Sequence, residues 1–388
     1  MKEKINLGII GLGMVFRFGY LPWLKSYLRQ PWVELKAVSD LKEELGVKYS
    51  RKFKCDYYKG SFDLLKSGID AVIINSPNWT HEELVVEAAN SKLHILCEKP
   101  MAPTVEACDR MISACRKSGV LLLISQMRRF NPGFQKIREF VMKGELGDLV
   151  ELNVNWPFFI PEIDKSPYKE VLSWIERYLH INLAERYGSW RLKDSRSGGG
   201  NFLDHGPHII DFFRWIAGDI THVTGSSNVL VKGRNEDYTK CVLKFKSGAT
   251  GYITTTIYDF KYGLIGKAYG FIRGTRGRVD FTLPNPVRFK PIRYLKIYRE
   301  PDSNLKKVLT LATLRRLGGK RTRLQKKYVF KDQLDYFLTT ILGKRRPHPV
   351  FGDEDFAAKG EDGRYAIKIV ELVYKAARSE DPRWLPVS

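Results

Sequence analysis

A glycine-rich turn near the start of the chain limits the fold more than any other feature. Residues 5–10 are apolar and strand-like, Gly11-Leu12-Gly13 follows, and residues 14–28 have the apolar spacing of a helix. In a G-x-G-x-x-G turn the first glycine allows the tight bend and the second lets the backbone approach a pyrophosphate. The third allows close packing of helix on strand. Gly11 and Gly13 meet the first two needs. Phe16 replaces the third glycine and predicts a wider spacing or a rotated side chain.

A carboxylate further along supports a dinucleotide at this turn. Asp40 ends the second predicted strand. Its distance from the end of the glycine motif is close to the ~20 residues expected for the acid that binds ribose hydroxyls. The phosphates would lie against the amides of Gly13, Met14 and Val15, which open the helix. A carboxylate repels a 2′-phosphate, so the pattern favours NAD over NADP, a preference that Lys42 softens. A glycine bend without a ligand is the alternative.

The first part of the chain alternates between strand-like and helix-like segments. We predict strands at 5–10, 34–39, 71–75, 94–98 and 120–125, and helices at 14–28, 42–53, 80–91 and 104–118. This alternation is typical of a parallel sheet with helices on both faces. We therefore predict an α/β domain over residues 1–127.

The pattern changes after Phe130-Asn131-Pro132. Helices are predicted at 133–144, 206–217, 331–343 and 361–378, and strands at 149–156, 220–231, 239–246, 250–259, 267–273 and 278–282. Short polar turns between the strands favour an antiparallel sheet. Residues 128–388 are thus expected to form an α+β domain around an open, mostly antiparallel sheet, with helix 361–378 as a candidate to pack back on the first domain. An open sheet needs cover, which predicts a homo-oligomer.

Composition limits the class of protein. The chain of 388 residues has no apolar run near the ~18 residues that a membrane span needs. With no such run and no signal-peptide cleavage pattern, we expect a cytoplasmic location. The five cysteines form no C-x-x-C pair, so we expect free thiols and no zinc site. The net charge is +22, and residues 288–346 hold 18 Lys or Arg against 4 Asp or Glu. No nucleic-acid motif accompanies this charge. Residues 308–327 are interpreted as a solvated basic loop, with an anionic membrane surface or a charged sugar nucleotide as alternative contacts.

Three residues are candidates for acid–base chemistry. Lys99 follows a predicted buried strand, and Pro100 restricts it to extended geometry. Asp204 and His208 are four apart and would share one helix face, with Pro207 near the first helical position. His205 is expected to point elsewhere, and no further ligand cluster supports a metal. A surface lysine, a capping aspartate and a core histidine are the structural alternatives.

Several short motifs resemble one family when taken in order. They are "SPNWTH" (76–81), "CEKPM" (97–101), "WR" (190–191) and "GGGNFLDHGPHIIDFF" (198–213), together with the glycine turn. The chain resembles the Gfo/Idh/MocA family of sugar and polyol oxidoreductases, with Phe16 as its departure. The resemblance implies a Rossmann domain followed by an α+β domain whose open sheet often mediates oligomers. It also implies that Lys99, Asp204 and His208 form the catalytic group.

The resemblance also extends the predicted cofactor site. It implies that Asn78 and His81 lie near the cofactor, that Glu98 binds the nicotinamide ribose, and that Trp190 and Arg191 reach across to it. The predicted cofactor-binding residues are Gly11, Gly13, Met14, Val15, Asp40, Asn75, Ser76, Pro77, Asn78, His81, Glu98, Lys99, Trp190 and Arg191.

The function expected from these residues is that of an oxidoreductase. It would move a hydride between NAD(H) and a secondary hydroxyl or keto group of a sugar, polyol or sugar derivative, including a nucleotide sugar. Lys99 would stabilise the alkoxide, His208 would accept the proton and Asp204 would orient His208. The alternatives are an NAD-dependent redox glycosidase and a non-catalytic dinucleotide- or sugar-binding regulator. The expected partners are a small-molecule substrate and further copies of the chain, as a dimer or tetramer.

Overall fold

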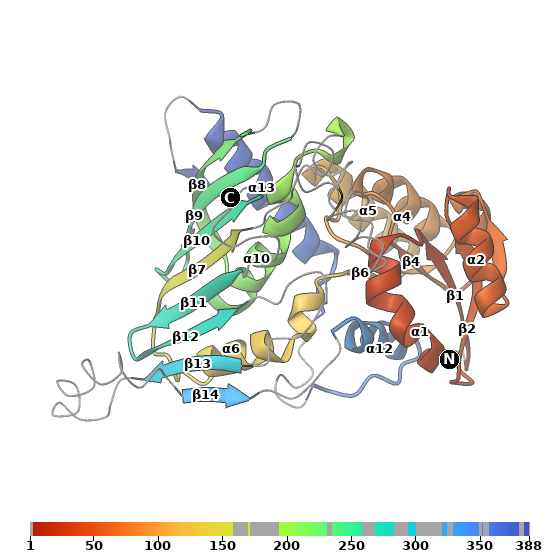
Figure 1. Cartoon of the computed structure of the whole chain (residues 1–388), viewed down its shortest axis with the longest axis horizontal. Coiled ribbons are helices and arrows are strands. Elements are labelled where there is room, and N and C mark those ends of the chain that lie inside the picture. The colour runs from red at the N-terminus through yellow and green to blue at the C-terminus, as the bar shows by residue number, and fades with distance from the viewer. Residues whose placement is uncertain are drawn as a thin grey trace. The chain divides into compact units, whose positions relative to one another are not determined.

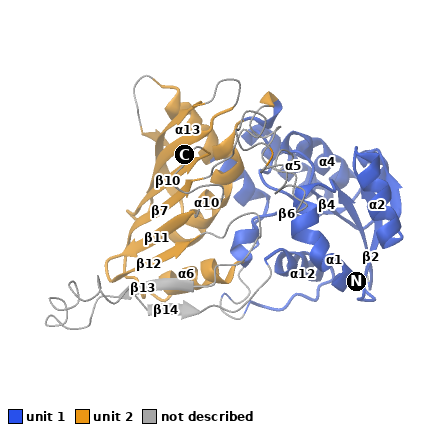
Figure 2. Cartoon of the chain, in the orientation of Figure 1, with its two compact units in different colours: residues 1–130, 196–198, 328–368 blue, residues 131–195, 199–327, 369–388 orange. Residues whose placement is uncertain are grey.

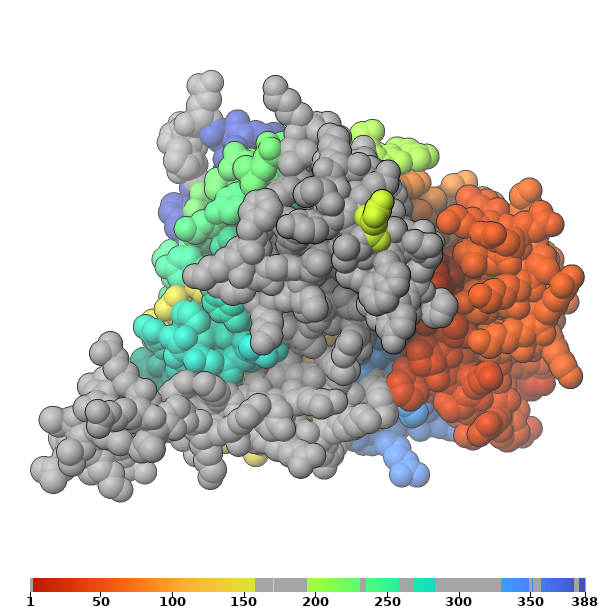
Figure 3. Space-filling model, in the orientation of Figure 1, coloured from red at the N-terminus to blue at the C-terminus, as the bar shows by residue number. Residues whose placement is uncertain are grey.

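The computed structural model divides the chain into two compact units (Figure 1, Figure 2). It describes residues 3–157, 170, 194–230, 235–257, 268–282, 294–299, 320–323, 329–348, 351, 357–379 and 384–387. Unit 1 comprises residues 1–130, 196–198 and 328–368, and unit 2 comprises 131–195, 199–327 and 369–388. The units therefore differ from a single cut after residue 127, because two later segments belong to unit 1. Figure 3 shows the N-terminal residues of unit 1, in red and orange, at its surface.

Unit 1 is built on a parallel sheet. Its strand order is β3-β2-β1-β4-β5-β6, formed by β1 (Ile5–Ile10), β2 (Val33–Ser39), β3 (Asp56–Tyr58), β4 (Ala71–Ile74), β5 (His94–Cys97) and β6 (Leu122–Ile124). All neighbours pair in parallel. This is the doubly wound nucleotide-binding order, which reverses between β1 and β4 and binds ligands beyond the carboxyl ends of the strands there. The predicted Rossmann architecture is confirmed.

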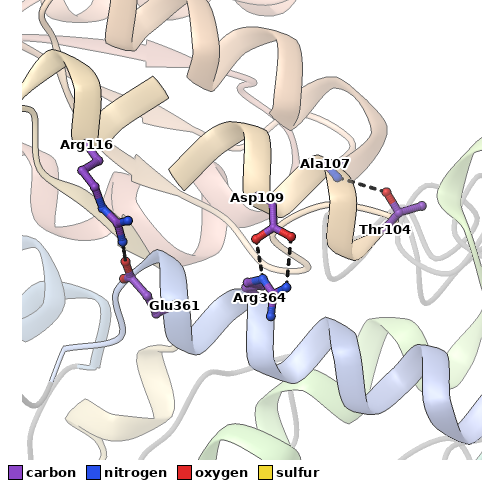
Figure 4. Close-up of polar contacts among 6 residues, drawn as sticks. All are labelled: Thr104, Ala107, Asp109, Arg116, Glu361 and Arg364. Atoms are coloured by element: carbon purple, nitrogen blue, oxygen red, sulfur yellow. Dashed lines mark hydrogen bonds and ion pairs between the residues drawn. The ribbon is translucent and has the colours of Figure 1, made fainter. Parts of the chain in front are cut away.

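The helices of unit 1 follow the strands as expected. They are α1 (Leu21–Tyr27), α2 (Glu43–Phe53), α3 (Ser61–Leu65), α4 (His81–Asn90) and α5 (Val105–Ser118). Local chemistry fixes the ends of α5. The Thr104 hydroxyl accepts from the Ala107 amide at 3.2 Å (Figure 4). Gly119 ends the helix at a φ of +68°. The sequence pattern missed β3 and α3, because three and five residues are too few to show a period.

Two C-terminal helices contribute to unit 1. They are α12 (Val329–Ile341) and the first turns of α13 (Gly360–Ala377). Arg364 of α13 donates two hydrogen bonds to the Asp109 carboxylate of α5, and Arg116 donates to Glu361 at 3.2 Å (Figure 4). The start of the predicted helix 361–378 thus packs on α5.

Unit 2 is built on a nine-stranded mixed sheet. Its order is β14-β13-β12-β11-β7-β10-β9-β8-β15, and the strands are β7 (Leu149–Pro157), β8 (Ile220–Asn228), β9 (Tyr238–Phe245), β10 (Thr250–Thr256), β11 (Tyr269–Gly274), β12 (Gly277–Thr282), β13 (Tyr294–Arg299), β14 (Lys320–Arg323) and β15 (Leu385–Pro386). Only β7 and β10 pair in parallel among these strands, so the mostly antiparallel prediction is confirmed. Residues 320–323 form a strand, so the loop interpretation of 308–327 is wrong there. The rest of 308–327 lies outside the described residues.

The core of unit 2 lies between this sheet and helices α6 (Pro132–Met142) and α10 (Asn201–Ala217). Phe134 of α6 packs on Phe212 of α10, with ring centroids 4.1 Å apart, and both contact Phe281 of β12. Helix α10 begins at Asn201, so Pro207 lies inside it, and the prediction that the helix starts near Pro207 is wrong. None of the described helices is long and apolar enough to cross a membrane.

Candidate functional site

The glycine turn after β1 meets the turn after β4. Gly11 has a φ of +85°, and a Cβ there would lie 2.8 Å from the carbonyl carbon of Asn75. Gly11 therefore permits both a left-handed conformation and the close approach of two backbones. A Cβ on Gly13 would meet no atom within 4 Å. The second glycine thus borders open space, where a phosphate can reach the backbone.

Phe16 is accommodated without covering this turn. Its side chain is 0% exposed and packs edge-on against Tyr49 of α2, with ring centroids 4.9 Å apart. Residues Phe16–Tyr20 (η1) form a π-helical turn before α1, rather than the single helix predicted over 14–28. The wider turn and the aromatic pair replace the close contact that a third glycine would give. Met14 and Val15, at the start of this segment, are half-buried.

Asp40 is fixed beside the glycine turn. One carboxylate oxygen accepts from the Leu12 amide at 2.7 Å, and the other accepts from the Lys42 amide at 2.8 Å. The acid thus joins the end of β2 to the turn after β1. Each carboxylate oxygen has a second lone pair, so the group can still accept from a ligand diol.

The turn after β4 carries two buried amide oxygens without a partner in the described structure. Asn75 donates to the Gly11 carbonyl at 3.4 Å, and Asn78 donates to the Ser197 carbonyl at 2.8 Å, while the Oδ1 atom of each is buried and unbonded. An unpaired buried acceptor is costly, and a ligand with hydroxyl or amide donors would satisfy it. A nicotinamide dinucleotide carries both donor types, so these residues fit the cofactor.

His81 ties the turn after β4 to the residues after Lys99. Its Nδ1 lies 3.0 Å from the Pro100 carbonyl oxygen and 3.2 Å from that of Met101, and its Nε2 lies 2.9 Å from that of Ser76. The ring is buried at the start of α4, which follows the short turn η2 (Asn78–Thr80) begun by Pro77. His81 therefore holds together two loops of the predicted cofactor site.

Glu98 and Lys99 follow β5 at the carboxyl edge of the sheet. Glu98 is 6% exposed, and its Oε1 accepts from the Tyr20 hydroxyl at 3.2 Å. Its Oε2 accepts from the Lys99 amide at 3.3 Å. Burial raises the pKa of Glu98, while Ser125, the Lys99 charge and Tyr20 lower it. A partly compensated carboxyl group thus lies directly beside the candidate catalytic lysine.

The other two candidate catalytic residues lie on α10 in unit 2. His208 is buried, and the Asp204 side chain is 21% exposed, one helical turn earlier. His205 was expected to point elsewhere, and its Nδ1 lies 3.2 Å from the Asn201 carbonyl oxygen, its hydrogen-bond partner. The same nitrogen lies 3.8 Å from an Asp204 carboxylate oxygen, and the ring packs 4.9 Å from that of Trp156. The imidazole of His205 is therefore close to Asp204, a neighbour that the sequence pattern did not predict.

No sequence pattern predicted the group that holds the start of α10. The Glu236 carboxylate accepts from the amides of Gly200 and Phe202, and the Tyr374 hydroxyl donates to it at 2.6 Å. Burial raises the pKa of Glu236, and these donors oppose the rise. A Cβ on Gly200 would lie 2.2 Å from the Glu236 carbonyl oxygen, which accounts for a glycine of the "GGG" run. Glu236 and Tyr374 are far apart in the sequence, so no local pattern joins them.

Two predicted cofactor residues, Trp190 and Arg191, lie outside the described residues. The described residues contain no group of three or more side chains suited to a metal. The structure brings together in unit 1 the predicted residues of the loops after β1, β2, β4 and β5.

Comparisons with known proteins agree with this architecture. Residues 5–126 match the model of the Gfo/Idh/MocA oxidoreductase family with an NAD-binding Rossmann fold, and residues 134–280 match the C-terminal domain of the same family. The chain is 30% identical to a myo-inositol 2-dehydrogenase of Thermotoga maritima over 79% of this chain and 86% of that protein. It is 27% identical to a 2,7-anhydro-N-acetylneuraminate hydratase of Escherichia coli, over 72% of this chain and 68% of that protein.

Among solved structures, the fold is similar to that of the WlbA dehydrogenase of Bordetella pertussis, which was crystallised with NADH and UDP-GlcNAcA. The TM-score is 0.74 at 20% identity, covering 100% of this chain and 98% of that one.

Proposed function

Because the chain belongs to the Gfo/Idh/MocA family of NAD-binding oxidoreductases, we propose that it oxidises or reduces a sugar, a polyol or a sugar derivative, nucleotide sugars included. The observation that carries this proposal is the arrangement of polar groups at the carboxyl edge of the unit 1 sheet. The loops that precede Lys99 there hold Gly13, beside which no atom lies within 4 Å of a Cβ position, and the unbonded Oδ1 atoms of Asn75 and Asn78. The names of two relatives, an inositol dehydrogenase and an enzyme bound to a nucleotide sugar, support a polyhydroxylated substrate.

In the proposed reaction Lys99, His208 and Asp204 have different roles. Bound NAD supplies the acceptor for the hydride that leaves the secondary carbon. Lys99 stabilises the negative charge that develops on the hydroxyl oxygen, as an ammonium can in a site shielded from water. His208 accepts the hydroxyl proton, and Asp204 orients the imidazole and anchors a substrate hydroxyl. In the reductive direction His208 returns the proton.

The remaining site residues hold the cofactor in this proposal. The amides of Gly13, Met14 and Val15 bind the pyrophosphate at a helix start. Asp40 binds the adenosine ribose, and Asn75, Ser76 and Pro77 form the wall opposite the glycine turn. Asn78, His81 and Glu98 lie toward the nicotinamide end, and the resemblance assigns Trp190 and Arg191 to the same end.

The test separates chemistry from cofactor binding. Lys99→Met is expected to lower kcat by about 10³-fold on any accepted substrate while the Kd for NAD stays within about twofold. Lys66→Met, which removes an exposed lysine of unit 1, is the matched control and should behave as the wild type. Activity that persists in Lys99→Met would exclude the assigned role.

A second function is favoured by one observation. The Escherichia coli relative is named as a hydratase, and hydration involves no net oxidation of the substrate. For this chain the corresponding reaction would be the cleavage of a glycosidic bond, with bound NAD supplying a transient hydride acceptor. Product formation without accumulation of NADH would favour this function over a dehydrogenase.

We also propose that the chain acts in the cytoplasm as a homo-oligomer, a dimer or a tetramer. All five cysteines are free thiols in the structure, as a reducing compartment favours. The outer face of the unit 2 sheet carries half-exposed aromatic side chains such as Tyr252 and Phe271, which suit an interface with a second copy. Light scattering coupled to gel filtration measures the mass, and a monomer at micromolar concentration would contradict this assembly.

A further inference from the structure

Four buried side chains form a polar cluster behind Lys99, on elements far apart in the sequence. Tyr20 comes from η1, Glu98 follows β5, Ser125 follows β6, and Gln333 belongs to α12. The Tyr20 hydroxyl donates to Glu98 at 3.2 Å and lies 3.5 Å from the Ser125 oxygen, which donates to Gln333 Oε1 at 3.3 Å. All four are less than 7% exposed. A polar cluster this deep is costly unless each group is paired, so its geometry is tightly determined.

The cluster is clamped by apolar packing. Tyr20 packs edge-on against Phe330 of α12, with centroids 5.1 Å apart, and a Cβ on Gly19 would lie 2.8 Å from the same ring. Tyr27 donates its hydroxyl to the Lys331 carbonyl at 2.9 Å on the same helix. Helix α12 thus contacts the segment that follows the glycine turn in two places, and only the Tyr20 contact leads to Glu98.

We propose that Tyr20 and Gln333 are positioning residues that hold the Glu98 carboxylate against the Lys99 amide and beside its ammonium group. The inference rests on the proposed role of Lys99. The hydroxyl of Tyr20 supplies a hydrogen bond to one carboxylate oxygen, and the Lys99 amide supplies one to the other. Gln333 fixes Ser125, the neutral neighbour of both Tyr20 and Glu98. The hydrogen bond to Glu98 thereby holds the backbone of Lys99, and the Glu98 carboxylate places a negative charge beside the Lys99 side chain.

The charge of Glu98 links this cluster to pH. Its neighbours with a charge or a titrating proton are Tyr20, Lys99 and Cys97, whereas Ser125 and Gln333 are neutral. Burial raises the pKa of Glu98, and the Tyr20 hydrogen bond lowers it, so loss of the hydroxyl raises it further. Glu98 would then be protonated at higher pH, and Lys99 would lose its anionic neighbour there.

The experiment compares Tyr20→Phe with Tyr27→Phe, because each removes one hydroxyl from a buried tyrosine that contacts α12. In the holoenzyme, kcat of Tyr20→Phe should fall up to about tenfold below that of Tyr27→Phe in the pH range between the Glu98 pKa values of the two variants, the weight of one hydrogen bond to a charged group. The two should converge at high pH, with equal Kd for NAD. Superimposable profiles would overturn the inference.

A second readout uses the apoprotein and does not depend on turnover. A raised pKa means that the folded state binds the proton more tightly, so the free energy of unfolding falls as pH rises through the folded pKa. The fall in the free energy of unfolding should extend to higher pH in Tyr20→Phe than in Tyr27→Phe. Adding Glu98→Gln to both variants should remove this difference between them. If Tyr20→Phe does not fold, Gln333→Glu replaces it in this measurement. Gln333→Glu places a second carboxyl group beside Ser125, so it should also move the fall in the free energy of unfolding to higher pH.

These readouts separate two failures. Wild-type protein that binds NAD but turns over no sugar or polyol would contradict the proposed function, and the apoprotein titration would still test the cluster. Wild-type turnover with identical Tyr20→Phe and Tyr27→Phe titrations would contradict the cluster alone.

Discussion

Gly11 and Gly13 are one residue apart, yet the structure needs them to be glycine for different reasons. Gly11 has a positive φ and lies close to the Asn75 backbone, whereas a Cβ added at Gly13 would meet no other atom within 4 Å. The first is therefore a requirement of the fold. The second is a requirement of whatever approaches the turn, which in our account is a pyrophosphate.

Paired substitutions test this difference. Gly11→Ala should lower the free energy of unfolding by roughly 2–3 kcal/mol, from backbone strain and a clash that only backbone movement can relieve. Gly13→Ala should change it by less than about 0.5 kcal/mol but weaken NAD binding about tenfold or more. Urea unfolding and isothermal titration measure the two effects. Unchanged NAD affinity in Gly13→Ala would show that the cofactor does not pass this turn.

Asp40 allows a second test at this scale. Asp40→Asn keeps one acceptor oxygen and loses the negative charge, so one of the two hydrogen bonds from the Leu12 and Lys42 backbone amides is lost. The variant should lose about 1 kcal/mol of stability and bind NADP relatively better, because the repulsion of a 2′-phosphate is gone. The ratio of the NAD and NADP dissociation constants measures the preference. A ratio equal to that of the wild type would remove Asp40 from cofactor selection.

Among the elements, α10 depends on a residue outside it. The Glu236 carboxylate satisfies two amides at the helix start, so Glu236→Ala should lower the free energy of unfolding by about 2–3 kcal/mol. Glu236→Gln keeps one acceptor and should cost about half as much. Circular dichroism during urea unfolding measures both. Equal stability of the two variants would show that the carboxylate does not cap the helix.

The ion pair between α13 and α5 contributes to stability with the opposite pH dependence from the Glu98 carboxyl group. Hydrogen bonds from Arg364 hold the pKa of Asp109 below its ordinary 3.8, so the pair stabilises the fold above that value and the contribution is lost as pH falls through the folded pKa. Both side chains are a third or more exposed, which limits the effect to about 1 kcal/mol or less. Asp109→Asn should match the wild type in stability at acid pH and fall below it at neutral pH. A constant difference would contradict the ion pair.

What the sequence predicts at the scale of elements depends on where the signal lies. The strands of unit 1 other than β3, and helix α5, could be predicted because their apolar patterns lie within the segments themselves. The residues that cap α5, Thr104 and Gly119, are local to the helix as well. The start of α10 was misplaced because Pro207 is a local signal, whereas the capping Glu236 lies on another segment. For the same reason the sequence identified Lys99 and Glu98 but not Tyr20 or Gln333, whose contacts form only when the chain folds.

At the scale of the whole molecule, neither unit is one continuous stretch of the chain. Unit 1 takes in residues 196–198 and 328–368, and α13 is divided between the units after residue 368. Contacts between residues far apart in the sequence produce this arrangement, such as the ring contact of Phe330 with Tyr20 and the ion pair of Arg364 with Asp109. The strand–helix alternation of residues 1–127 could not reveal it, because those contacts come from the other end of the chain.

In the proposed function, the described loops of unit 1 hold NAD for a hydride transfer assisted by Lys99. The most direct measurement is a single turnover with enzyme-bound NAD and a polyol or sugar deuterated at its secondary carbons, stopped by acid and read by mass spectrometry. We expect deuterium on the cofactor in the wild type and about 10³-fold slower labelling in Lys99→Met. Enzyme that binds NAD and a substrate but leaves the cofactor unlabelled would contradict it.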